Sequence, residues 1–105
     1  MSRLVQLRQS RAELLRHIQS IEEMRRGSVT RQFLKAKRPA DETDVFIGPY
    51  PLFTCKNNGR TVGRRLHDLD EVRMIERQVE NYHTFRRLCV RLVEVSEAIC
   101  EEKDR

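Results

Sequence analysis

Residues that could bind a metal or act as nucleophiles are few and scattered. None of the three histidines has a cysteine or histidine partner at a ligand spacing. The chain contains no CxxC, HExxH, GxSxG or phosphate-cradling glycine motif. The residues concerned are His17, His67, His83, Cys55, Cys89 and Cys100. We therefore expect no enzyme activity, no catalytic residue, no metal and no cofactor.

Some of these residues have competing interpretations. His67 with Asp68 and Asp70 resembles a small ligand cluster, but a strand end followed by a helix cap explains the same residues and is preferred. Cys89 and Cys100 fall on or beside a helical apolar stripe, where thiols act as small hydrophobic side chains. Tyr82 and Phe85 share that helical phase, which indicates core packing more than base stacking.

Positive charge is concentrated in the middle of the chain. Over the whole 105 residues the net charge is +5. Residues 25–65 hold ten basic and three acidic residues and so carry +7, which leaves −2 for the flanks. Such a segment favours a nucleic-acid partner, with duplex DNA preferred over RNA. The candidate nucleic-acid-binding residues are Arg25, Arg26, Arg31, Lys35, Lys56, Asn57, Asn58, Arg60, Thr61, Arg64 and Arg65.

These residue types suit groove recognition. Arginine and asparagine can make paired hydrogen bonds to guanine and adenine, and flanking cations can reach phosphates. The competing interpretation is a solvated sheet face, with lysine and arginine guarding exposed edges against aggregation.

A helix is predicted over residues 3–25, and it is the first of the elements that must position the basic segment at residues 25–65. Ser2 can cap its start, and Leu4, Leu7, Leu14 and Ile18 follow the spacing of a coiled coil. The range contains neither glycine nor proline. Gly27 is expected to end the helix.

A three-stranded antiparallel sheet is predicted over residues 28–66. Strands are expected at 28–35, 50–56 and 60–66, with an exposed loop at 36–47. Asn58-Gly59 is typical of a two-residue type I′ hairpin, which pairs Lys56 with Thr61. Side chains alternate along strands, so one face should pack and the other should be open. The packed set is Phe53, Cys55, Val62 and Leu66, and the open set is Tyr50, Thr54, Lys56, Thr61 and Arg65.

A long helix is predicted over residues 69–103. Asp68 and Glu71 form a capping box, and apolar residues recur every three or four positions as far as Ile99. One half should pack under the sheet and the other should pair with the first helix. The expected fold is therefore α+β, a single domain over 1–105, with the helices forming an antiparallel coiled-coil-like stalk. Because a two-helix stalk leaves apolar surface open, a homodimer is expected.

The pattern resembles a known prokaryotic family. The segments are the run from Arg25 to Lys35 with its Gly-Ser-Val element, Gly48-Pro49-Tyr50, and Asn58-Gly59-Arg60-Thr61, followed by the helix around Asn81-Tyr82. Together they resemble an uncharacterised bacterial and archaeal small-domain family often described as transposase-associated or hypothetical proteins. The resemblance runs from about Leu14 to Ile99. It implies a mobile-element context and a transposase or recombinase as the protein partner, with no activity to transfer.

One departure from the family pattern bears on metal binding. Many members of that family carry a cysteine cluster between the first strand and the Gly-Pro-Tyr element. This chain has no cysteine or histidine at 35–47, which argues against a metal knuckle there. The order of three strands and a helix also resembles the arm-type DNA-binding domains of tyrosine recombinases, in fold only.

Localisation follows from what the sequence lacks. No apolar run has the length of a membrane span, no signal peptide is recognisable, and three widely spaced cysteines suit a reducing compartment. We expect a cytoplasmic protein without membrane contact. The predicted function is a non-enzymatic nucleic-acid-binding accessory protein of a mobile element. The alternative is a protein–protein adaptor that acts through its stalk and has no nucleic-acid role.

Overall fold

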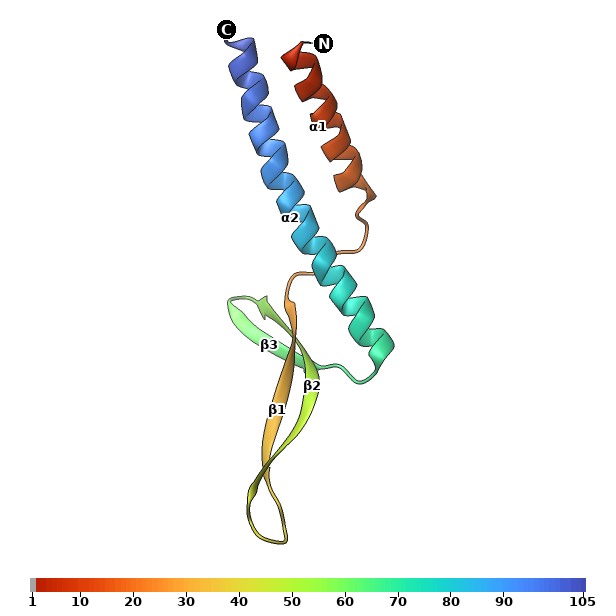
Figure 1. Ribbon diagram of the computed structural model, residues 1–105, viewed down its shortest axis with the longest axis vertical. Coiled ribbons are helices and arrows are strands. Elements are labelled where there is room, and N and C mark those ends of the chain that lie inside the picture. Colours follow the sequence, from red (N-terminus) through yellow and green to blue (C-terminus); the bar gives the residue numbers. More distant parts are fainter. Residues whose placement is uncertain (1) are drawn as a thin grey trace. The chain divides into compact units, whose positions relative to one another are not determined.

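The computed structural model describes residues 2–105 and has the predicted α+β composition (Figure 1). The elements in chain order are α1 (Arg3–Ser20), β1 (Ser28–Lys37), β2 (Asp44–Asn57), β3 (Arg60–Arg65) and α2 (Leu69–Lys103). Where the sequence predicted one domain, the chain divides into two compact units. The helical unit comprises the chain up to Met24 together with Glu80–Arg105, and the sheet unit is Arg25–Val79.

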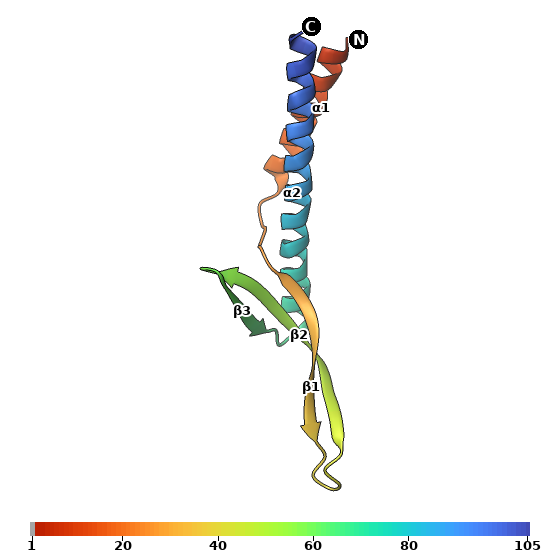
Figure 2. The same ribbon diagram turned by 90° about the vertical axis from the view of Figure 1, so that its left-hand side faces the viewer.

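The helical unit is the predicted antiparallel helix pair. Both views show α1 alongside the C-terminal part of α2, with the two chain ends at the same end of the pair (Figures 1 and 2). Ser2 caps α1 by accepting a 3.1 Å hydrogen bond from the Val5 amide. At the far end of α2, Glu102 lies 3.4 Å from the Arg3 guanidinium. The apolar row on α2 has regular coiled-coil spacing and consists of Phe85, Leu88, Leu92, Val95 and Ile99.

The first helix is shorter than predicted. It ends at Ser20, with Ile21 as its C-cap in extended geometry, whereas the apolar spacing predicted a helix to residue 25. The following backbone finds partners elsewhere, since the Glu23 carbonyl accepts a 2.8 Å hydrogen bond from the Asn81 amide group. A tertiary hydrogen bond thus replaces helical ones before Gly27 is reached.

The three strands form one sheet in the order β1-β2-β3. The predicted hairpin register is confirmed, because Lys56 pairs with Thr61 and Phe53 with Arg64. The turn has positive φ at both central residues, 53° at Asn58 and 79° at Gly59, as a type I′ turn requires.

The exposed loop predicted at 36–47 is largely wrong. Strand β1 continues to Lys37 and β2 already begins at Asp44, and Ala36 pairs with Val45. Only residues 38–43 connect the strands. The register shifts opposite Gly48-Pro49, the pair predicted to start a new segment. Backbone pairing continues past this irregularity, so the proline marks a bulge and not a strand boundary.

The core of the sheet unit lies between β2 and the first turns of α2. Phe53 and Leu66 are buried against Val72, Ile75 and Val79 of the helix. Asp68 caps α2 as predicted, accepting a 2.7 Å hydrogen bond from the Glu71 amide. Cys55 packs beside the cluster. Val62, assigned to the packed face, is 48% exposed because the core cluster does not extend beyond Cys55 toward the turn.

We predict that replacing two phenylalanines of β2 by alanine has very different effects on the free energy of unfolding. Phe53 is 6% exposed and Phe46 is 70% exposed. Phe53→Ala should lower the free energy of unfolding by about 3–5 kcal/mol, since it removes the ring around which the core packs. Phe46→Ala should change it by less than ~0.5 kcal/mol. Urea denaturation of both variants measures the difference, and equal destabilisation would contradict this description of the core.

Candidate functional site

The sheet has two chemically different faces, which the observed register defines. Directly paired residues share a face, and α2 packs on the face that carries Phe53. We call this the helix face, and it carries Val29, Arg31, Pro51, Phe53, Cys55, Asn57, Arg60, Val62 and Arg64. We call the opposite side the open face, and it carries Ser28, Thr30, Gln32, Tyr50, Leu52, Thr54, Lys56, Thr61, Gly63 and Arg65.

Cations beside α2 on the helix face are held by carboxylates of that helix. Arg31 lies 3.2 Å from Glu76, and Arg64 pairs with Glu71 in the first turn of the helix. The ion pair with Glu71 explains why a charged residue, Arg64, is found on the packed face. Both arginines were predicted to bind nucleic acid, but each already has a carboxylate partner within the sheet unit.

Two further predicted residues also have internal partners. Arg25 donates from Nε to the Gln78 side chain at 2.9 Å, and its guanidinium lies 5.7 Å from the Phe53 ring centroid. Its backbone amide also donates to the Gln78 carbonyl at 3.0 Å. Lys35 forms a 3.1 Å ion pair with Asp44. These contacts tie strands and helix together, so neither residue is a free cation.

The remaining predicted cations have no carboxylate partner among the described residues. They are Arg26, Lys56, Arg60 and Arg65. The Arg65 guanidinium stacks 3.5 Å from the centroid of the Tyr50 ring, which holds its charge on the open face. Asn57 and Arg60 pair with each other beside the turn that Asn58 occupies. Lys56 and Arg65 therefore lie on the open face, Arg60 lies beside the β2–β3 turn on the helix-face side, and Arg26 precedes β1.

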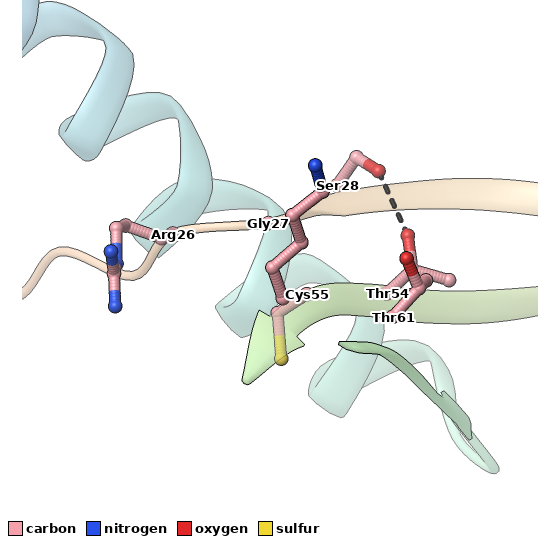
Figure 3. Close-up of a pocket in the computed structure, with 7 residues that line it drawn as sticks. Arg26, Gly27, Ser28, Thr54, Cys55 and Thr61 are labelled. Carbon is pink, nitrogen blue, oxygen red and sulfur yellow. Dashed lines mark hydrogen bonds between the residues drawn. The ribbon is translucent and has the colours of Figure 1, made fainter. Parts of the chain in front are cut away.

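A surface hollow of about 400 Å³ lies where β1 begins (Figure 3). It is lined by residues 26–28, residues 54–56 and Thr61. The Ser28 and Thr54 hydroxyls share a 3.1 Å hydrogen bond, drawn as the dashed line in Figure 3, and Thr61 lines the same hollow. Gly27 makes this approach possible, because a Cβ there would come within 2.5 Å of the Thr54 carbonyl oxygen.

Ser28 and Thr54 were not among the predicted site residues. Their juxtaposition depends on the pairing of β1 with β2, in which Ser28 faces Thr54. The Asn-Gly motif indicates the register of β2 with β3, but no comparable turn motif marks the β1–β2 connection. The sequence signal that could have extended β1 beyond residue 35 is the alternation of apolar and polar residues at 34–37.

The described residues form neither a metal-binding cluster nor a membrane-spanning helix. Among residues 2–105, no three histidine, cysteine, aspartate or glutamate side chains come together in a way that could hold a metal ion. Within the same residues, neither helix combines the length and apolarity needed to cross a bilayer.

Comparisons of the chain with protein-family models, with curated proteins and with solved structures gave no match.

The Arg64–Glu71 pair predicts a specific acid dependence of stability. The hydrogen bond from Arg64 lowers the pKa of Glu71 below its ordinary value of 4.5, with a further contribution from the His67 amide. A carboxyl whose folded pKa is depressed stabilises the fold above its unfolded pKa, and that contribution disappears as pH falls through the folded pKa. Arg64→Gln should therefore be less stable than wild type at pH 7, with the difference shrinking as the pH falls below about 4.5.

Urea midpoints between pH 7 and pH 3 measure this difference. Arg60→Gln is the matched control, because it removes the same charge from an arginine with no carboxylate partner among the described residues. A stability gap between wild type and Arg64→Gln that stays constant across the range would contradict the assignment.

Proposed function

We propose that this protein is a non-enzymatic nucleic-acid-binding protein that contacts duplex DNA through the open face of its sheet and the adjoining turn. The observation that supports this most is the sorting of cations between the two faces. Arg31 and Arg64 on the helix face have carboxylate partners, whereas Lys56 and Arg65 on the open face have none among the described residues. An unneutralised cationic face attracts a polyanion, because binding releases the counterions condensed on it.

The shape and chemistry of the open face fit a groove of DNA. A sheet of two or three strands can enter the major groove, where its side chains reach base edges. Asn57 and Asn58 at the turn supply amide groups, and Arg60 and Arg65 supply guanidinium groups that can bind guanine or phosphate. Thr61 adds a hydroxyl group on the same strand.

The biological setting proposed is that of a mobile element. It rests on the resemblance of the Gly-Ser-Val, Gly-Pro-Tyr and Asn-Gly-Arg-Thr segments to a family described as transposase-associated. In that setting a transposase or recombinase is the expected protein partner, and the chain acts as its accessory.

The helical unit supports self-association as part of this function. Helix α1 has no fully buried residue between Arg3 and Ser20. Its apolar row, which includes Leu4, Leu7 and Leu14, is only half-buried against α2. A second copy packed on this row would complete the core, and a dimer would present two open faces to one DNA duplex.

The same half-buried row favours a second candidate function. An amphipathic helix pair can equally receive a helix of another protein, which would make the chain a protein–protein adaptor with no nucleic-acid role. The two functions differ in salt response, because a hydrophobic interface depends little on salt whereas phosphate contacts depend on it steeply.

Duplex binding should depend on the unpaired cations. We expect Arg60→Gln combined with Arg65→Gln to reduce the slope of log affinity against log salt by about 0.9 for each phosphate that the variant no longer neutralises. Fluorescence anisotropy of a labelled random duplex over a range of KCl concentrations measures the slope. Single-stranded DNA and RNA probes of the same length test the preference for duplex DNA.

The matched control is Arg31→Gln combined with Arg64→Gln, which removes the same charge from arginines paired with Glu76 and Glu71. It should leave the salt slope nearly unchanged. An equal reduction of the slope in the two double variants would show that only net charge matters. No salt-dependent binding by the wild type would favour the adaptor.

Dimerisation should depend on the half-buried row of α1. Light scattering of the wild type should give twice the mass of the 12.5 kDa chain. Leu14→Asp should shift the mass toward one chain, because it places a carboxylate in the apolar row. Gln19→Asp adds the same charge at an exposed position of α1 and should leave the mass unchanged. A wild type with the mass of one chain would contradict the dimer.

A further inference from the structure

The hollow at the start of β1 offers hydrogen-bond donors without acidic acceptors. Its charged lining residues, Arg26 and Lys56, have no carboxylate partner among the described residues, and no acidic residue lines it. The Thr61 hydroxyl makes no hydrogen bond among the described residues 2–105. Ser28 and Thr54 share one hydrogen bond, so one of their two hydroxyl protons is left to donate outward. The hollow is therefore electrostatically suited to an anion.

We propose that this hollow binds one phosphate group. A phosphate presents several acceptor oxygens in tetrahedral directions, and the hollow is lined by residues with donor groups from three separate segments of chain. A carboxylate has two oxygens and would leave donors of the hollow unused. The volume of about 400 Å³ accommodates a phosphate together with the sugar attached to it.

The backbone geometry at Gly27 keeps this site in place. Its φ of +133° belongs to the region that favours glycine, and a Cβ would also lie 2.7 Å from the Phe53 ring. Gly27 therefore lies directly against β2 and the buried Phe53, with Arg26 and Ser28 on either side of it. Ser28, Thr54, Lys56 and Thr61 are carried by strands of the sheet, and Gly27 links Arg26 to the same strands.

This inference deepens the proposed function and rests on it for the source of the phosphate, which would be a nucleic-acid strand. The hollow would then fix one phosphate while Arg60, Arg65 and the turn contact the rest of the duplex. The chemistry of the hollow itself can be tested without nucleic acid.

The direct experiment is an NMR titration of the full-length ¹⁵N-labelled protein with inorganic phosphate at constant ionic strength. We expect saturable shifts of the Gly27, Ser28 and Thr61 amide signals, and clearly smaller shifts with acetate. Lys56→Gln should weaken phosphate binding about tenfold, the effect of removing one charge-assisted hydrogen bond. Thr61→Val should weaken it less, with the fold monitored in the same spectra.

Lys35→Gln is the control, because it removes the same charge from a lysine that is already paired with Asp44 and lies outside the hollow. It should change phosphate affinity by less than about twofold. Shifts that never saturate, shifts of equal size with acetate, or equal weakening by Lys56→Gln and Lys35→Gln would each overturn the proposal.

Titrations with two oligonucleotides identify the source of the phosphate. If a 5′-phosphorylated strand shifts the amide signals of the hollow at lower concentration than the same strand with a 5′-hydroxyl, the ligand is a terminal phosphate. If both strands shift these signals equally, the ligand is a backbone phosphate. Phosphate binding without any oligonucleotide binding would support the phosphate site in the hollow and refute the nucleic-acid function. Duplex binding that responds to Arg60 and Arg65, with no shift of the hollow's amides by phosphate, would refute the hollow alone.

Discussion

The burial of Phe53 under α2 sorts the charges of the sheet unit. Phe53, Leu66, Val72, Ile75 and Val79 form the core of this unit, and their packing covers one face of the sheet. It brings α2 carboxylates beside the arginines of that face, so Arg31 and Arg64 are neutralised within the protein. Cations on the opposite face receive no such partner among the described residues. This hydrophobic packing therefore makes the charges of Arg31 and Arg64 unavailable to a ligand.

Because of these ion pairs, the net charge of the middle segment overstates the positive charge available to a ligand. A regional +7 suggested a broad cationic surface, but internal ion pairs of the sheet unit neutralise part of that charge. The cations without a carboxylate partner are fewer, and Lys56 and Arg65 among them lie on the open face, beside hydroxyl groups and the Tyr50–Arg65 stack. A compact set of donors is better suited to recognising individual phosphates than a diffuse positive surface, which would only attract polyanions.

Predictions that rested on a short local motif were accurate, whereas those that depended on distant residues were not. The Asn58-Gly59 turn needs positive φ at two adjacent residues, so its register was predictable and is confirmed. The Asp68 cap and the extent of α2 were equally local. The end of α1 and the extent of β1 and β2 were predicted wrongly, because the Glu23 carbonyl bonds to Asn81 and Ala36 pairs with Val45. No short sequence motif indicates either Asn81 or Val45 as the partner.

The sequence by itself determined the α+β class, the hairpin register, the alternation of side chains across the strands and the excess of positive charge in the middle of the chain. These depend on backbone preferences and on counting. Only the tertiary structure decided which arginines are paired, that Ser28 meets Thr54, and that Gly27 brings Arg26 to the edge of the sheet. Those facts depend on distances between separate segments of the chain, and whether a charge is neutralised depends on which carboxylate packing brings within reach of it.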